Sequence, residues 1–493
     1  MKSLQTFLAK PGNAFGLMAL FYICYMFLPR AVPQGMFVDG LLYSSISRNL
    51  AEGRGSWWLP YFSIAYWIEG IPRDHYYENP PLLFWMQSAF FRVFGDHWWV
   101  EKLYASVLLV LNCFLITRIW KTVLKSMNME RSLPWLPVLF FYLIPIVFWG
   151  SAYNLIDSQL LTFCLLATWV ILLGLINHRQ RTMNYALAVL FIFLGMLTKG
   201  PVAVYPVALP FIYFMVFDRT KWWTGMIHSL ILFSSVLTVF ALLLWLNPAA
   251  LNFFREYWNQ RLSFAIMGGR TEGVRHGLGR LYVFWIVMRE NSILISLALV
   301  AIILSYVKRI PIFSSRDESK WALVFLCLGL AGTIPLMLST RQAGMYLIPS
   351  LVMFAIAAAL FQYDLVRQLL SKISNRSAKI ISVLMILGLI SIVIYSATIF
   401  GKPARDEDLL EDIHAIEPMV PKTNTIALAD VEVCSSSKNI YLQRYLKLEL
   451  TNIDEHAKFA VLGMPLLSVQ DSLLKSKGFV QAYSGKKLSL YKK

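Results

Sequence analysis

Three carboxylates stand at the edges of apolar runs, where an unpaired charge is costly and often marks a functional site. Asp39 precedes an amphipathic stretch at 41–50, Glu78 precedes a Pro-Pro pair, and Asp157 lies at the mouth of a long apolar run. Helix capping or complementing a helix dipole would also explain the first two. A carboxylate beside a membrane surface is equally the group that would act as a base on a lipid-borne substrate.

Cations and a tyrosine occupy comparable positions later in the chain. Lys199-Gly200-Pro201 separates two apolar runs, and the polar segment 248–280 is rich in arginine. An acid and a cation at headgroup depth suit chemistry on a phosphate-bearing lipid, because the cation neutralises the leaving phosphate while the acid orients or deprotonates an acceptor. A lone histidine in a polar loop is usually just solvated, so spacing alone argues little for a metal ligand. The candidates are Lys199, Arg270, His276, Arg341 and Tyr346.

The composition indicates that lipid surrounds most of the chain. Of 493 residues, 57% are hydrophobic and only 15% are charged, against about 25% charged in soluble domains. The net charge of +17 is spread over short clusters between apolar runs, which is typical of membrane topology and argues against nucleic-acid binding. Four of the five cysteines lie inside apolar runs, so no disulfide framework is predicted.

Eleven apolar runs are long enough to span or nearly span a bilayer, and two shorter ones could be re-entrant or interfacial. We therefore expect an α-helical polytopic membrane protein with about 11–13 transmembrane helices and amphipathic interfacial helices in its first outer loop. The first run is expected to be retained rather than cleaved as a signal peptide. The runs lie near 14–31, 101–120, 133–150, 157–177, 183–198, 201–217, 226–247, 281–306, 321–338, 344–362 and 379–400, and the shorter segments at 57–68 and 81–94.

The charges of the connecting segments test these spans independently of hydropathy. For this test, the spans are threaded back and forth with the N-terminus in the cytoplasm. The five cytoplasmic connections then hold 16 basic and five acidic residues, as the positive-inside rule requires. All candidate site residues fall on the opposite, outer side. The predicted location is the bacterial inner membrane, with the tail in the periplasm.

The tail differs in composition from the rest of the chain. Its apolar stretches at 425–429, 459–462 and 488–491 are short and are separated by helix-like runs at 438–448 and 466–477. This pattern predicts a small α/β domain. The expected division is a transmembrane domain at 1–400, with its first outer loop at 32–100, and a soluble periplasmic domain at 401–493.

The order of these motifs resembles the GT-C glycosyltransferases. An acid after the first span, a Pro-Pro-Leu-x-x-Trp segment, a membrane-edge aspartate and Lys-Gly-Pro are most similar to the branch of the protein O-mannosyltransferases and the lipid A aminoarabinose transferase. The resemblance covers about residues 10–365. It implies a membrane enzyme that takes a sugar from a polyprenyl-phosphate carrier at the outer face, usually with inversion at the anomeric carbon.

The resemblance also implies residue roles. The catalytic candidates are Asp39, Asp157 and Glu78, and Tyr76 and Tyr346 match tyrosines of the family that we take as substrate-binding. Lys199, Arg270 and Arg341 are further substrate-binding candidates, as cations that could replace a phosphate contact made by a lysine in the family. His276 would share a divalent cation, zinc, magnesium or manganese, with Glu78. Two positions depart from the family, because Gly40 replaces a second acid and Asn79 replaces the lysine of Lys-Pro-Pro.

The leading hypothesis is sugar transfer from an undecaprenyl-phosphate donor to lipid A or a related glycolipid. An enzyme like the protein O-mannosyltransferases and a transporter or flippase for lipid-linked sugars are the alternatives, and a non-catalytic assembly protein is a third class. Transporters place charges near the bilayer midplane and often show repeats, whereas these charges lie at one edge. The expected partners are the donor, the acceptor and membrane lipids, and no nucleic acid.

Overall fold

The computed structural model describes residues 2–63, 75–129, 133–267, 278–421, 425–430, 432–433, 436–451, 457–465 and 468–493. It divides into two compact units. The helical unit comprises Met1–Ala31 and Ala105–Thr398, and the loop–tail unit comprises Val32–Tyr104 and Ile399–Lys493. The first outer loop thus belongs with the tail, whereas the sequence grouped it with the transmembrane helices.

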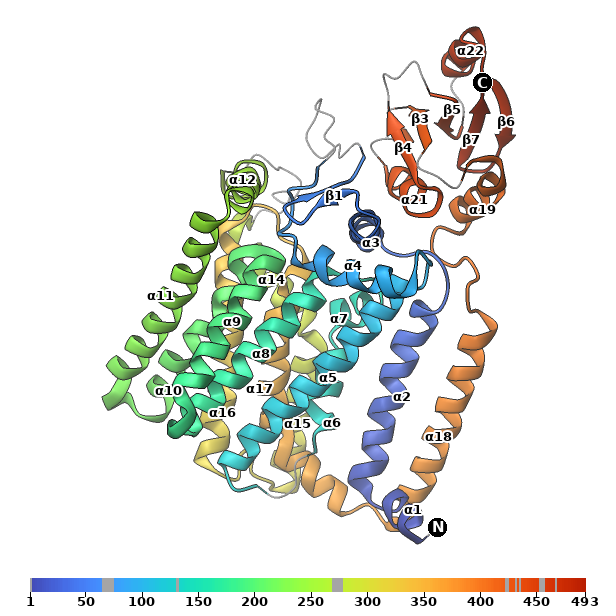
Figure 1. Ribbon diagram of the computed structural model, residues 1–493. Helices are drawn as coiled ribbons and strands as arrows, with labels where there is room; N and C mark the ends of the chain where they lie inside the picture. The colour runs from blue at the N-terminus through green and yellow to red at the C-terminus, as the bar shows by residue number, and fades with distance from the viewer. Residues whose placement is uncertain are drawn as a thin grey trace. The chain divides into compact units, whose positions relative to one another are not determined.

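Long apolar helices build the helical unit (Figure 1). Among the described residues, eight helices are long and apolar enough to cross a membrane, or nine if the bent pair α14–α15 is one span. The polytopic helical class is confirmed, with fewer such helices than the 11–13 expected. The helices are α1 (Lys2–Leu8), α2 (Pro11–Ala31), α5 (Val100–Ser126), α6 (Trp135–Tyr142), α7 (Pro145–Gly150), α8 (Ile156–Ile176), α9 (Arg181–Lys199), α10 (Leu209–Phe217), α11 (Trp222–Leu246), α12 (Pro248–Tyr257), α13 (Ser263–Met267), α14 (Tyr282–Glu290), α15 (Ser292–Lys308), α16 (Arg316–Thr333), α17 (Ile348–Ser371) and α18 (Asn375–Thr398).

Interruptions within the predicted helices account for the lower number of membrane-spanning helices. The run at 133–150 is two short helices, because Pro145 has no N–H to continue the helix from α6. The runs at 183–198 and 201–217 form one helical stretch in which the 3-10 helix η2 (Gly200–Ala208) joins α9 to α10. Tyr185 near the start of α9 and Phe214 near the end of α10 both contact the ring of His228, so the chain reverses between them.

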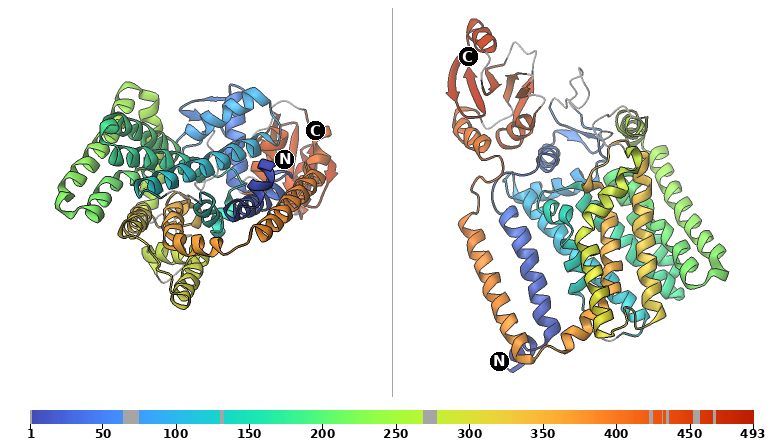
Figure 2. Two further views of the ribbon diagram at one scale, coloured as in Figure 1. Left: turned by 90° about the horizontal axis from the view of Figure 1, so that it is seen from below. Right: turned by 180° about the vertical axis from the view of Figure 1, so that it is seen from behind.

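Helices α8 and α17 form the centre of this unit and bury most of their surface, whereas α11 and α18 expose most of theirs (Figure 2). Because α8 and α9 run antiparallel, the start of one and the end of the other lie at the same edge. The predicted cytoplasmic basic residues Arg179 and Arg181 lie at the opposite ends of these helices, about 28 Å away along the 19-residue α9. The separation of basic clusters from site residues is therefore real, and which edge faces the cytoplasm stays a prediction.

Among its described residues, the tail folds into a mixed sheet with three α-helices. Its strand order is β4-β3-β5-β7-β6, with β3 parallel to β4 and β5, and β7 antiparallel to β5 and β6. The predicted apolar stretches become β3, β5 and β7, and the helix-like runs become α21 and α22, so the α/β expectation is confirmed. The elements are α19 (Glu407–Ile416), β3 (Thr425–Ala429), α21 (Ser437–Leu446), β4 (Leu448–Thr451), β5 (Phe459–Gly463), α22 (Ser468–Ser476), β6 (Val480–Ser484) and β7 (Leu488–Lys492).

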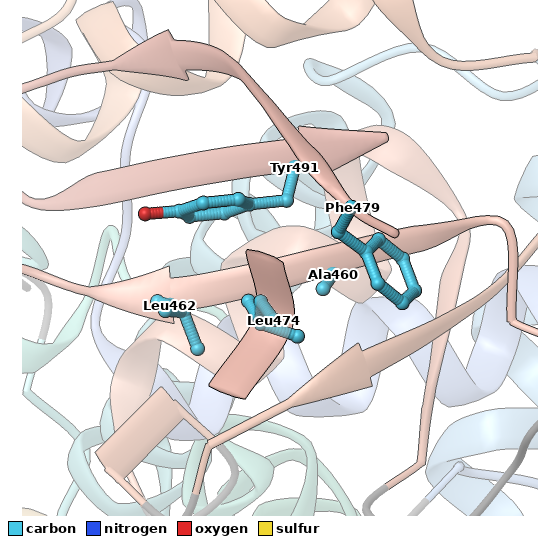
Figure 3. Close-up of a cluster of buried hydrophobic side chains, with 5 residues drawn as sticks. All are labelled: Ala460, Leu462, Leu474, Phe479 and Tyr491. Atoms are coloured by element: carbon cyan, nitrogen blue, oxygen red, sulfur yellow. The ribbon is translucent and has the colours of Figure 1, made fainter. Parts of the chain in front are cut away.

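One face of this sheet carries a compact apolar cluster. Ala460 and Leu462 on β5 and Tyr491 on β7 pack against Leu474 of α22 and against Phe479, which precedes β6 (Figure 3). All five side chains are buried. This alternation of inward-facing residues along β5 is what a sheet covered by a helix requires.

The first loop contributes α3 (Val38–Ala51), the hairpin β1 (Gly55–Ser56) with β2 (Leu59–Pro60), and α4 (Leu82–Phe94). The predicted helix at 41–50 forms, but all eleven residues from Gly40 to Leu50 are buried, because α4 and α21 cover it. The helix with a free apolar face is α4, which exposes Met86, Val93 and Phe94. Its 13 residues cannot cross about 30 Å of hydrocarbon, which fits an interfacial helix.

A buried arginine ties α21 to the first loop. The Arg444 guanidinium donates to both carboxylate oxygens of Glu101 at 3.0 and 2.8 Å, and to Asp96 Oδ1 at 2.8 Å. Arg48 of α3 donates to the Arg444 carbonyl oxygen at 3.1 Å. Arg444 and Glu101 are 3% and 1% exposed, so each charge depends on the other for its solvation.

Replacing Arg444 with methionine should lower the free energy of unfolding by about 3–5 kcal/mol, because Glu101 would be left buried without its partner. The measurement is the melting temperature of the full-length protein in detergent. Lys486→Met is the control, since Lys486 binds Asp408 and Glu411 at the exposed surface and should melt like the wild type. Equal melting temperatures for the two variants would contradict the assigned role of Arg444.

Candidate functional site

An ion pair between α8 and α9 lies at one edge of the helical unit. Lys199 Nζ donates to Asp157 Oδ1 at 2.6 Å and to Oδ2 at 2.7 Å. Asp157 is 1% exposed and stands in the first turn of α8, while Lys199 ends α9. Each charge therefore has the sign that its helix terminus favours. Both carboxylate oxygens of Asp157 are engaged by Lys199, so this acid holds the lysine in place.

Tyr346 adds an aromatic face to this pair. Lys199 Nζ lies 4.3 Å from the centroid of the Tyr346 ring, within cation–π distance. Tyr346 belongs to the 3-10 helix η8 (Gly344–Leu347), which leads into α17. Three predicted residues from separate parts of the sequence thus meet at one point. We call this end of the helical unit the Lys199 edge.

The sequence reasoning missed Tyr257, the last residue of α12. Gly200 has φ +74°, and a Cβ added to it would lie 2.7 Å from the Tyr257 hydroxyl oxygen, so only glycine fits the turn after Lys199. Burial raises the pKa of Tyr257 to about 12, although Arg261 opposes this shift, and the phenol is protonated at neutral pH. A π-helical turn (Trp258–Leu262) follows, a feature frequent at functional sites.

Further cations gather at the Lys199 edge. Arg341 lies in the hairpin before η8, where its backbone N–H donates to Ser339 Oγ at 3.2 Å. Arg289 binds Glu290 Oε1 through two N–H groups at 3.1 and 2.6 Å. Glu290, which the sequence did not single out, also accepts from the Ile146 N–H at 2.9 Å and so anchors the start of α7. Among the described residues named here, the cations Lys199, Arg261, Arg289 and Arg341 outnumber the acids Asp157 and Glu290.

Asp39 belongs to the loop–tail unit and lies within the first turn of α3. The N-cap residue of α3 is Phe37, whose ring cannot accept a hydrogen bond, so Asp39 is inside the helix rather than its cap. It is partly exposed, unlike the eleven buried residues that follow it. Asp39 therefore places a carboxylate, whose negative charge the helix N-terminus favours, at a partly exposed position.

Tyr76, Glu78 and Asn79 precede α4 in the same unit. Asn79 Nδ2 donates to the Tyr76 hydroxyl at 2.7 Å, and both side chains are buried. The Tyr76 ring packs edge-on against Phe84, and Tyr43, one turn after Asp39, packs on the same Phe84. The segments that carry Asp39 and Glu78 therefore meet through one aromatic side chain.

The remaining predicted residues, Arg270 and His276, lie outside the described residues. Among the residues that the structure describes, no three His, Cys, Asp or Glu side chains are grouped as metal ligands. A cation shared by Glu78 and His276 stays a prediction, and no step below is routed through it.

Replacing Lys199 with methionine should destabilise the protein by about 3–5 kcal/mol, because Asp157 would be left buried without a counter-charge. The double variant Asp157→Asn/Lys199→Met should recover most of the lost stability, since neither group is then charged. Melting temperatures in detergent give the comparison. A double variant as unstable as the single one would show that the ion pair is not what matters at this position.

Comparison with known proteins gives one family and one fold. Residues 78–245 match the family model described as dolichyl-phosphate-mannose-protein mannosyltransferase. No curated protein matches the sequence.

Two similar solved structures are crystal structures of ArnT from Cupriavidus metallidurans. The structure bound to undecaprenyl phosphate has a TM-score of 0.61 and 14% identity, over 96% of this chain and 97% of that chain. The apo structure has a TM-score of 0.60 and 13% identity, over 97% and 98%. At such low identity the likeness shows the fold, and the family match covers the part that holds Glu78, Asp157 and Lys199. The predicted resemblance is thus confirmed, and the chain carries the fold of the GT-C glycosyltransferase superfamily.

Proposed function

We propose that the protein transfers a sugar from an undecaprenyl-phosphate donor to a lipid acceptor at the periplasmic face of the bacterial inner membrane, with lipid A or a related glycolipid as the acceptor. The observation that carries this proposal is a cation, Lys199, two residues before the first residue that lines an apolar cavity. Such a combination matches the two ends of a polyprenyl phosphate, which has one anionic group and a long hydrocarbon chain.

The cavity lies in the helical unit and has a volume of about 470 Å³. Its lining starts at Pro201, two residues after Lys199, and continues over η2, α10, α11 and α16. The walls are almost entirely apolar and include Tyr205, Phe211, Leu230 and Phe233. A prenyl chain in this cavity would leave its phosphate near Lys199. The crystal structure of the similar ArnT, which contains undecaprenyl phosphate, supports this choice of donor.

The chemistry follows from the charges. The acceptor oxygen attacks the anomeric carbon, the bond from that carbon to the phosphate oxygen breaks, and the polyprenyl phosphate leaves with its electron pair. Lys199 stabilises the phosphate, and Asp157 holds the lysine in position through two hydrogen bonds. Asp39 takes the proton when the acceptor is a hydroxyl group and orients the acceptor when it is a phosphate.

The positive charge of the Lys199 edge favours an anionic acceptor. Arg289 is about half exposed, and Arg341 lies in the hairpin that precedes Tyr346. Arginines present paired donors that match phosphate oxygens. A protein acceptor is the second candidate, because the matching family model describes a protein mannosyltransferase. A transporter is disfavoured, since the charges that could bind a substrate are at one edge of the helices.

Cells that lack the gene should lose one sugar mass from an envelope glycolipid, and Asp39→Asn should fail to restore it while the protein is still made at normal levels. Mass spectrometry of glycolipids and glycoproteins gives the readout, and loss from proteins alone would select the second candidate. Asp408→Asn, a change at an exposed tail carboxylate, is the control and should restore the product fully. Full restoration by Asp39→Asn would remove Asp39 from the catalytic role.

Filling the cavity should weaken donor binding. Ala208→Trp places a large ring among the lining residues, so we expect affinity for undecaprenyl phosphate to fall at least tenfold, or about 1.4 kcal/mol. Binding of undecaprenyl phosphate to the purified protein can be followed by native mass spectrometry. Val383→Trp, on the exposed face of α18, is the control and should bind normally. Equal affinity of Ala208→Trp and wild type would place the lipid elsewhere.

A further inference from the structure

The backbone that leads into Asp39 is held by the chain segment that follows α18. The Gln34 N–H donates to the Lys402 carbonyl oxygen at 2.9 Å, and the Ala404 N–H donates to the Gln34 carbonyl oxygen at 3.3 Å. The Gly401 N–H donates to the Val32 carbonyl oxygen at 3.0 Å. These bonds form a short parallel bridge at Gln34 and Pro403, although the two segments are more than 360 residues apart in the sequence.

Gly35 and Phe37 extend this contact toward the helix. Gly35 has φ +85°, and a Cβ added there would overlap the carbonyl oxygen of Arg405, so this position requires glycine. The Arg405 guanidinium lies 5.5 Å from the centroid of the Phe37 ring. The segment after α18 thus contacts Val32, Gln34, Gly35 and Phe37, and Phe37 is the N-cap residue of α3.

Two tyrosines of α21 also hold the backbone before α3. The Met36 N–H donates to the Tyr441 hydroxyl at 3.4 Å, and the Tyr441 hydroxyl donates to Asp406 Oδ2 at 2.7 Å. The Gly35 N–H donates to the Tyr445 hydroxyl at 3.2 Å. The rings of Tyr441 and Tyr445 stack on each other, with their centroids 5.9 Å apart. Met36 lies three residues before Asp39, and its backbone position sets where α3 begins.

Helix α21 is itself fixed in place. Arg444, between the two tyrosines in sequence, makes its buried ion pairs with Glu101 and Asp96, and Arg48 of α3 binds its carbonyl oxygen. Lys102 donates to the Gly35 carbonyl oxygen at 2.8 Å from the other side. The Tyr441 hydroxyl therefore belongs to a helix that buried ion pairs hold against the first loop.

We infer that the C-terminal α/β domain is a positioning element for the reaction, and that Tyr441 is the residue through which α21 holds the backbone of Asp39. The inference rests on the role of Asp39 in the proposed function. It gives the tail a task that does not require it to bind substrate. Misplacing a reacting group by about 1 Å can cost on the order of 100-fold in rate, so a loosened helix start would slow transfer.

A purely structural role for Tyr441 would make a different prediction, because loss of its hydroxyl would then lower stability without a local effect at α3. Tyr491 offers a matched comparison in the same domain. Its ring is buried and its hydroxyl donates to Asp471 at 2.7 Å, as the Tyr441 hydroxyl does to Asp406 (Figure 3). The described contacts of Tyr491 do not include residues 32–39.

The experiment compares Tyr441→Phe, Tyr491→Phe and Asp39→Asn in the full-length protein. Hydrogen–deuterium exchange is measured for peptides covering residues 34–41, together with the melting temperature and the amount of sugar-modified product formed in membranes over time. We expect Tyr441→Phe to raise the exchange rate at 34–41 roughly tenfold, because the Met36 N–H loses its acceptor. Product formation should fall roughly tenfold in the same variant. Tyr491→Phe should leave both unchanged while lowering the melting temperature by a similar amount.

The outcomes separate the two proposals. Wild-type exchange and wild-type transfer in Tyr441→Phe, with transfer abolished by Asp39→Asn, would overturn the positioning role and leave the proposed function intact. Full transfer by Asp39→Asn would overturn the role of Asp39, whatever Tyr441→Phe does. If Tyr441→Phe proves too unstable to compare, Tyr445→Phe removes only the acceptor of the Gly35 N–H, and unchanged exchange and transfer in that variant would overturn the inference.

Discussion

The ion pair between Lys199 and Asp157 determines how the centre of the helical unit is arranged. A carboxylate that is 1% exposed needs a counter-charge within hydrogen-bond distance, and Lys199 supplies it from the end of the neighbouring antiparallel helix. This requirement fixes α8 and α9 in register. Helix α9 ends directly after the lysine, because Gly200 takes φ +74° and Pro201 has no N–H to continue the helix. The lining of the apolar cavity begins at Pro201. The buried acid thus holds the cation two residues before the cavity lining begins.

The loop–tail unit also contains a buried charge that needs a counter-charge, and here the charge is an arginine. Arg444 is almost fully buried and is neutralised by Glu101 and Asp96, which flank the start of α5. The pairing forces α21 of the tail against α3 of the first loop. Asp39 is partly exposed, while the backbone before it is hydrogen-bonded to Tyr441 of α21. Mobility at this acid is thus limited from the tail, some 400 residues later in the chain.

Local patterns predicted the parts of the fold that local physics decides. Hydropathy located the long helices, and short apolar stretches located β3, β5 and β7 to within a residue, because each pattern reflects burial of a contiguous segment. That Asp157 and Lys199 lie at the same edge could be predicted, because the threading of the spans puts both residues on the outer side. The grouping of residues 32–104 with the tail could not, since contacts such as Gln34 with Lys402 are backbone hydrogen bonds that leave no side-chain pattern. Burial of α3 on all sides was missed because its polar side chains resemble a solvated face, and Tyr257 was missed because a single tyrosine in a polar segment carries no signal.

Asn79 bears on which residue would contact the lipid phosphate in the proposed function. The resembling family has a lysine at this position, but Asn79 is 6% exposed and its amide is committed to the hydroxyl of Tyr76. A buried, neutral amide supplies no positive charge to a lipid phosphate, and one of its two N–H groups already donates to Tyr76. The pair instead stiffens the entry to α4, next to the Phe84 ring that also supports Tyr43 of α3. The position has thus become part of the scaffold around Asp39 and Glu78. Under the proposed function, the positive charge at the phosphate then comes from another side chain, and our candidate is Lys199, two residues before the first residue that lines the apolar cavity.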